Sequence, residues 1–135
     1  MSEITPVLTV GKRKTAVAKA IARIGAGRIR VNSVPIEIHY PEIARRKMLE
    51  PVLLAGDKAK GLDITVDVMG GGIMGQAEAA RTAIAKSLVS FLKDEELEKV
   101  FRQYDRSLLI SDPRRKLPKN PAGRGARKRK QKSYR

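Results

Sequence analysis

The last 23 residues of the chain, Pro113 to Arg135, constrain its fold more than any other segment. They carry 11 Lys and Arg side chains and no acidic one, and Leu117 is their only large aliphatic residue. Such a segment buries too little apolar surface to offset the entropy of ordering it, and its like charges repel one another. We therefore expect a globular domain over residues 1–112 and a basic tail over residues 113–135 that is disordered without a partner.

The tail accounts for most of the net charge. The whole chain holds 29 basic and 14 acidic side chains, a formal charge of +15, and residues 1–112 contain all 14 acids with the other 18 bases. A cationic run without acids is typical of an arm that binds nucleic acid, because Lys and Arg neutralise phosphates. The tail residues that we predict to bind RNA phosphates are Arg114, Arg115, Lys116, Lys119, Arg124, Arg127, Lys128, Arg129 and Lys130.

The residues that enzymes and metal sites need are scarce. The chain has no cysteine and a single histidine, His39, which excludes disulfides, thiol catalysis, Cys-ligated zinc and a pair of histidine ligands. Its unbroken apolar runs are only a few residues long, too short to span a bilayer. We expect no enzyme activity, no cofactor, no metal and no membrane partner, and the charge favours a polyanion as partner.

Two segments of the globular part predict β structure. Residues 62–69 alternate apolar and polar side chains as a half-buried strand does, and residues 28–40 alternate about an Asn32-Ser33 turn, which indicates a hairpin. Residues 16–24 are ambiguous. Three β-branched residues in them have helical spacing, whereas a strand would give one face made only of alanines. Propensity alone favours a helix there.

Apolar residues at helical spacing predict the helices. Residues 41–49 begin with a proline, whose missing N–H costs nothing in a first turn. Residues 75–93 form the main predicted helix, and the carboxylate of Asp94 can cap a last one that follows it. Because the strands are grouped apart from the late helices, we expect an α+β fold with helices layered on a sheet.

The run Gly70-Gly71-Gly72 follows the strand at 62–69 and, with Gly75, satisfies the dinucleotide fingerprint G-x-G-x-x-G. The fingerprint also requires a second strand that ends in an acid, whereas the acid at the right distance, Asp94, begins another helix. A nucleotide-dependent enzyme is therefore a weak alternative. Two interpretations stay open: a tight turn without a ligand, or a phosphate contact at the helix N-terminus supported by Gln76 and Arg81.

Lys12, Arg13 and Lys14 form a second cationic group, in a short turn after Gly11. The group is similar to a phosphate-binding loop only in part, because the first glycine of that pattern is absent. We interpret it as a contact with nucleic-acid phosphates, and solvated charge is the alternative.

Several blocks of sequence together resemble one known family, the ninth protein of the small ribosomal subunit. They are GKRKTA at 11–16, RVN at 30–32, GGGIMGQAEAARTAIAKSL at 70–88, DPRR at 112–115 and QKSYR at 131–135. The glycine-led block is the most specific, and the resemblance extends from residue 11 to residue 135. The ending S-Y-R is similar to that of archaeal or eukaryotic members.

The resemblance implies a two-layer α+β sandwich like the second domain of the fifth small-subunit protein, with a long basic C-terminal extension and with residues 16–24 as a strand. It implies a structural role in the cytoplasm, in the head of the small subunit, bound to the 3′ major domain of ribosomal RNA beside neighbouring head proteins. In that family the tail runs through RNA toward peptidyl-site tRNA. The residues that we assign to tRNA are Gln131, Lys132 and Arg135, together with Tyr134, whose ring can stack on a base.

A basic DNA-packaging or chromatin-like protein is the main alternative from another class. It would need the same positive charge, but the chain shows no helix-turn-helix or zinc pattern. A preference for duplex DNA over structured RNA would distinguish it from a ribosomal protein.

Overall fold

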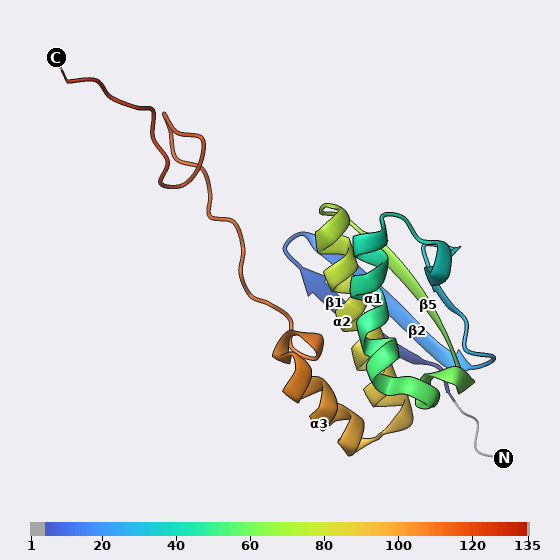
Figure 1. Cartoon of the computed structure of the whole chain (residues 1–135). Helices are drawn as coiled ribbons and strands as arrows, with labels where there is room; N and C mark the ends of the chain where they lie inside the picture. The colour runs from blue at the N-terminus through green and yellow to red at the C-terminus, as the bar shows by residue number, and fades with distance from the viewer. Residues whose placement is uncertain (1–4, 135) are drawn as a thin grey trace.

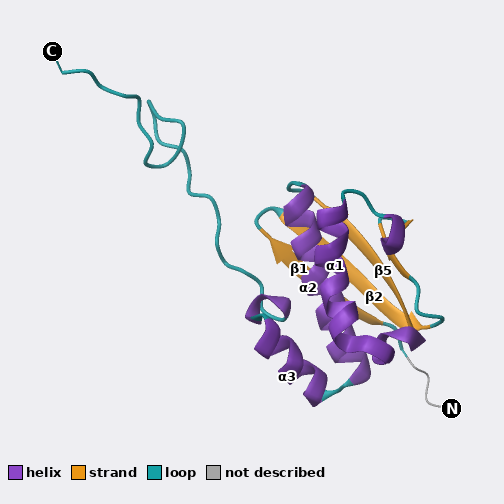
Figure 2. Ribbon diagram, viewed as in Figure 1, coloured by secondary structure: helices purple, strands orange, loops and turns teal. Residues whose placement is uncertain are grey.

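The computed structural model describes residues 5–134. Its elements are β1 (Val7–Arg13), β2 (Ala16–Ile24), β3 (Ile29–Val31), β4 (Val34–Pro35), η1 (Ile36–Ile38), α1 (Glu42–Ala55), η2 (Gly56–Gly61), β5 (Leu62–Met69), α2 (Ile73–Leu92), α3 (Glu95–Tyr104) and η3 (Arg106–Leu108). The strands form one sheet in the order β1-β2-β5-β3-β4, in which β3 runs parallel to β5 and the other neighbours are antiparallel. Helices α1 and α2 cover one face of the sheet (Figure 1), which gives the two layers of Figure 2. The α+β class is confirmed.

Residues 16–24 form strand β2, so the helix that propensity alone favours is wrong and the strand that the family resemblance implies is confirmed. Its alternate residues are four alanines with no exposed surface, and they lie beneath α2: Ala16, Ala18, Ala20 and Ala22. The segment is paired along both edges, with β1 and with β5, so its backbone hydrogen bonds are satisfied in the sheet. The small face lets α2 pack closely on the sheet, and this tertiary packing outweighs local propensity.

Strand β1 corresponds to no element that the sequence pattern predicted, and it forms an edge of the sheet under α2. Contact between them is close at Gly11, where a Cβ atom would stand 2.2 Å from the carbonyl oxygen of Ala79 and 2.7 Å from the backbone nitrogen of Ala83. The hydroxyl of Thr9 also donates a hydrogen bond to the carbonyl of Ala83 at 2.9 Å. Lys12 and Arg13 therefore end a strand instead of lying within a turn.

The hairpin predicted over residues 28–40 is shorter than expected. Strands β3 and β4 pair around Asn32 and Ser33, which both have positive φ, as a tight hairpin turn requires. The second strand ends at Pro35, which has no N–H for a strand ladder. The next residue, Ile36, is buried in the core and begins η1, so the predicted continuation of the strand to residue 40 is wrong.

The helices are correct in type but not at every end. Helix α1 continues beyond residue 49 and through Pro51, because the buried proline ring packs in the core and offsets the hydrogen bond that a proline removes. Helix α2 begins at Ile73, two residues earlier than predicted. Helix α3 begins after Asp94, whose Oδ1 accepts hydrogen bonds from the backbone of Glu96 and Leu97, as the capping prediction requires.

Beyond η3 the chain leaves the domain. Residues 113–134 run outward without helix or named strand, apart from one closed loop partway along (Figure 1). All ten Lys and Arg side chains in this described part of the tail are exposed. Disorder of the free tail stays a prediction.

Candidate nucleic-acid interface

The cationic and glycine motifs meet at one end of the sheet. A Cβ atom on Gly70 would stand 2.7 Å from the carbonyl oxygen of Thr15, and one on Gly71 would stand 3.0 Å from the Cβ of Ala16. The β1–β2 turn, which contains Lys14, therefore lies directly against the turn between β5 and α2. Gly70 and Gly71 have φ of +79° and +66°, so this turn requires glycine whether or not it binds a phosphate.

Gln76 and Gly72 have different roles in this turn. The Nε2 atom of Gln76 donates a hydrogen bond to the carbonyl of Gly70 at 3.0 Å, so this amide holds the turn closed. Gly72 is the N-cap residue of α2, where no side chain accepts from the first turn, and a Cβ added to it would meet nothing within 4 Å. The backbone N–H groups at the start of α2 are therefore left for solvent or an anion. Both interpretations of the glycine run remain compatible with this geometry.

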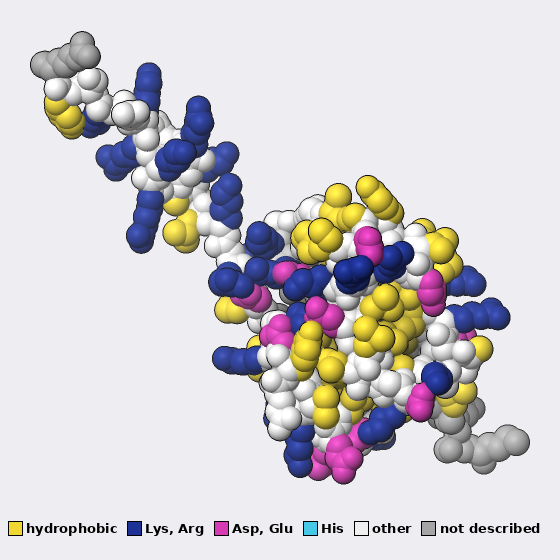
Figure 3. Space-filling model, viewed as in Figure 1, with side chains coloured by type: hydrophobic (Ala, Val, Ile, Leu, Met, Phe, Trp, Pro, Cys, Tyr) yellow, Lys and Arg dark blue, Asp and Glu magenta, His cyan; other side chains and the backbone are white. Residues whose placement is uncertain are grey.

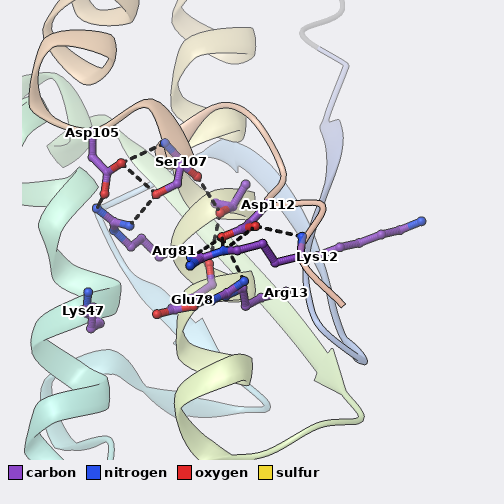
Figure 4. A pocket seen from close by; sticks show the side chains of 10 residues that line it. Lys12, Arg13, Lys47, Glu78, Arg81, Asp105, Ser107 and Asp112 are labelled. Carbon is purple, nitrogen blue, oxygen red and sulfur yellow. Dashed lines mark hydrogen bonds and ion pairs between the residues drawn. The ribbon is translucent and has the colours of Figure 1, made fainter. Parts of the chain in front are cut away.

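Arg13 is engaged in ion pairs within a cleft of about 330 Å³ (Figure 4). Its Nε atom lies 2.5 Å from Oε2 of Glu78, and its Nη1 atom lies 2.9 Å from Oδ2 of Asp112. The side chain is 15% exposed, so Arg13 joins β1 to α2 and to the base of the tail. Lys12 is exposed, and its side chain extends out of the cleft.

Arg81 lies in the same cleft, where its guanidinium is buried and paired with carboxylates, and its role as a phosphate contact stays a prediction. Its side chain is 6% exposed, its Nε lies 2.6 Å from Oε2 of Glu50, and its Nη2 lies 3.0 Å from Oδ2 of Asp105. Burial opposes ionisation of Asp105, but hydrogen bonds from Ser107 and Arg81 outweigh burial and lower the pKa of that carboxyl. Arg81 thus ties α2 to α1 and to the segment after α3.

Asp112 marks the point where the tail leaves the domain. The guanidinium of Arg114 donates to its Oδ2 from Nε at 2.9 Å and from Nη2 at 2.7 Å, and the backbone N–H of Arg114 donates to Oδ1 at 2.9 Å. These hydrogen bonds, the side-chain pair first, lower the pKa of Asp112 to about 2. Arg114 remains 77% exposed, so the same guanidinium still faces solvent.

The rest of the predicted tail contacts lie on exposed chain beyond this point, and Lys and Arg side chains project from the tail on several sides (Figure 3). They are Arg115, Lys116, Lys119, Arg124, Arg127, Lys128, Arg129, Lys130, Gln131, Lys132 and Tyr134. The ring of Tyr134 is 89% exposed. Arg135, which we predicted to contact tRNA, lies outside the described residues.

Four basic residues that the sequence pattern did not predict join this picture in the fold. Lys47 lines the cleft from α1, and nothing in the local sequence marks it. Lys19, Arg23 and Arg30 are exposed on the sheet face that the helices leave open. The alternation of residues 16–24 would have found two of them once the segment was taken as a strand.

Residues 5–134 contain neither a metal-binding cluster nor a membrane-spanning helix. No three His, Cys, Asp or Glu side chains in that range are grouped so that they could hold a metal ion. The helices of the same range are each too short or too polar to cross a membrane.

A small two-layer domain with an exposed polycationic tail is typical of basic proteins that bind nucleic acid. Residues 11–135 match the model of the family described as ribosomal protein S9/S16. The chain is 61% identical over 129 residues to small ribosomal subunit protein uS9 of Thermoplasma volcanium, which covers 96% of this chain and 98% of that protein. The protein of the same name from Thermoplasma acidophilum is 57% identical (96% and 100% covered), and that from Methanothrix thermoacetophila is 50% identical over 125 residues (93% and 95% covered). The chain therefore belongs to the ribosomal protein S9/S16 family.

Membership confirms the resemblance that the sequence blocks carried, including its archaeal character. The chain is a structural, non-enzymatic protein of the small ribosomal subunit, and it acts in translation within the cytoplasmic ribosome. As a member of this family it associates with small-subunit RNA and with other ribosomal proteins. Nothing in the comparisons supports the DNA-packaging alternative.

Proposed function

We propose that the chain holds small-subunit RNA through two surfaces and reaches peptidyl-site tRNA with the end of its tail. The first, which we call the sheet-end surface, consists of Lys12, Lys14, the turn Gly70–Gly72 and the first turn of α2. The second is the tail, residues 113–135. The observation that carries the proposal is that all ten described tail bases are exposed and that only Arg114 among them forms an ion pair.

The two surfaces have different physical roles. The sheet-end surface belongs to a folded domain, so its bases and free backbone N–H groups have fixed positions before RNA binds. The tail has no hydrophobic core and contributes positive charge. This charge neutralises phosphates that would otherwise repel one another where RNA strands pack together. The family resemblance supports the 3′ major domain as the RNA and head proteins as the neighbours.

The length and ending of the tail support a distant contact. At roughly 3.3 Å per residue, its 22 described residues span at most about 70 Å when fully extended, which is greater than the diameter of a small domain. Near the end, Gln131, Lys132 and Tyr134 are exposed, and an aromatic ring can stack on a base without sequence preference. Arg135 supplies a further cation in the sequence.

The tail's share of binding is measurable from salt dependence. A chain truncated after Asp112 should lose several units of the log–log slope of affinity against salt, because each lost phosphate contact removes roughly 0.7–0.9 of a unit. The double variant Lys12→Ala/Lys14→Ala is the control, and it should lose at most about two units. An unchanged slope in the truncated chain would contradict the tail as the main anchor.

Crosslinking tests the tRNA contact. A photoreactive group at position 134, in assembled small subunits that carry peptidyl-site tRNA, should crosslink to the tRNA anticodon stem-loop. The same group at position 117, which is 60% exposed near the base of the tail, should crosslink only to ribosomal RNA. Crosslinks from position 134 to ribosomal RNA alone would remove the tRNA contact and leave the RNA-binding role.

A further inference from the structure

The tail contains a closed loop over residues 120–129, which we call the tail loop. The side-chain Nδ2 of Asn120 donates a hydrogen bond to the carbonyl of Ala126 at 2.6 Å, and its backbone N–H lies 3.5 Å from the carbonyl oxygen of Gly125. Gly123 and Arg129 form an antiparallel bridge across the loop. The chain is therefore folded back on itself here, while the tail on either side is open (Figure 1).

Closure of the tail loop depends on one glycine and not on the other. A Cβ atom on Gly123 would stand 2.3 Å from the carbonyl oxygen of Lys128, a contact with backbone that cannot move aside without opening the loop. A Cβ atom on Gly125 would meet nothing within 4 Å, and its φ lies outside the left-handed region. The two glycines lie two residues apart in the same charge environment, so they form a matched pair.

The tail loop concentrates positive charge on a small frame. Four bases lie within it, all exposed and without an ion pair among the described residues: Arg124, Arg127, Lys128 and Arg129. The loop has no acidic residue. Dark side chains around this part of the tail point in several directions (Figure 3), so the bases are not aligned along one edge as they would be on one face of a strand.

We propose that the tail loop is a preformed element, an exception to the disorder predicted for the rest of the free tail, and that it binds converging phosphate backbones, as at a junction of RNA helices. A single duplex offers a bound chain the phosphates of only two strands, whereas diverging bases on a compact frame can contact phosphates of several strands at once. Closing the loop before binding also reduces the entropy that binding must overcome. The inference rests on the RNA-binding role proposed for the tail. It adds that binding depends on the closed shape of the tail loop as well as on its charge.

The test compares two variants of the full chain, Gly123→Ala and Gly125→Ala, which make the same chemical change and preserve every charge. Affinity is measured for a four-way RNA junction and for an RNA duplex with the same number of nucleotides. We expect Gly123→Ala to weaken binding to the junction about tenfold and Gly125→Ala to change it less than about twofold. Asn120→Ala should act in the same direction as Gly123→Ala, because it removes the hydrogen bond to Ala126. Thermal unfolding of each variant shows whether the domain is intact.

Two results would overturn the inference. Equal junction affinities for the two glycine variants would mean that charge acts without the closed loop. Equal affinities of the unchanged protein for junction and duplex would mean that the loop does not select converging strands. Neither result affects the proposed RNA-binding role of the tail, which depends instead on the salt slope of the chain truncated after Asp112.

Discussion

The Nη1 atom of Arg13 lies 2.9 Å from Oδ2 of Asp112, so the last residue of β1 is ion-paired to the residue at which the tail leaves the domain. Glu78 on α2 holds the Nε atom of the same guanidinium at 2.5 Å. A base that the sequence pattern assigned to phosphate binding therefore fixes the direction in which the tail departs. Exposed bases on either side of it, Lys12 and Lys14, remain available to RNA.

The first prediction concerns the pKa of Asp112. Arg114→Ala should raise this pKa from about 2 toward the usual carboxyl range, because it removes the largest cause of the shift. NMR titration of the Asp112 carboxyl measures it. Arg115→Ala, a change at the neighbouring exposed base, should leave the titration midpoint unchanged, and an equal shift in both variants would contradict a specific pair.

The same shift determines how this contact depends on pH. The pKa of Asp112 is lower in the folded chain than the value of about 3.9 expected for an unfolded aspartate. Its contribution to stability is therefore present above about pH 4 and is lost as the pH falls toward 2. In Arg114→Ala the folded pKa lies closer to the unfolded value, so this contribution should be smaller and should be lost over a narrower range of pH, which acid unfolding of the two proteins would detect.

A second prediction follows from the burial of Arg81. Arg81→Ala should lower the free energy of unfolding by about 2–4 kcal/mol, since it leaves two carboxylates unpaired in a partly buried cleft. Urea denaturation measures the loss. The control is Arg102→Ala on α3, where an exposed pair with Glu98 contributes less than about 1 kcal/mol. Similar losses in the two variants would show that Arg81 is not a buried anchor.

The sequence pattern predicted correctly the elements that depend on interactions between residues close together in the chain. The alternation of residues 62–69 coincides with β5, because one face of that strand is buried and the other is not. The side chain of Asp94 marked the start of α3 in the same way, because a cap acts within a few residues. The long acid-free run at the C-terminus marked the part of the chain that stays outside the core.

Other features depend on segments that meet only in the fold. The sequence predicts Arg13 and Arg81 as phosphate contacts, but it does not show their ion pairs, because the acids that pair with them lie in other segments, such as Glu50 on α1. No periodicity near a basic residue shows such a distant partner. The same limit applies to residues 16–24. They form a strand because their alanine face packs beneath α2 and because two neighbouring strands pair with them, and both α2 and one of these strands, β5, are distant in the sequence.

A third prediction tests the close packing of β1 on α2. Gly11→Ala should lower the free energy of unfolding by about 2–4 kcal/mol, because the added methyl group would collide with the backbone of the helix. Gly61→Ala is the control, since a Cβ atom there meets nothing within 4 Å and its φ is not left-handed. That variant should keep or slightly raise stability by restricting the unfolded chain. Thermal or urea unfolding of both variants decides the comparison.

The last prediction separates the two roles of the glycine turn. Gly70→Ala should lower the free energy of unfolding by about 1–3 kcal/mol, because φ is +79° and the methyl group would press on the carbonyl of Thr15. Gly72→Ala has open space and an extended backbone, so its stability should stay within about 0.5 kcal/mol of the unchanged protein.

Binding to small-subunit RNA then distinguishes a turn from a contact. If a phosphate approaches the uncapped N–H groups at the start of α2, the methyl group of Gly72→Ala stands in its path, and affinity should fall about threefold to tenfold. Filter binding at fixed salt measures the change. Unchanged affinity in Gly72→Ala would mean that the glycine run serves only as a turn, and the sheet-end surface would then consist of the charges of Lys12 and Lys14 alone.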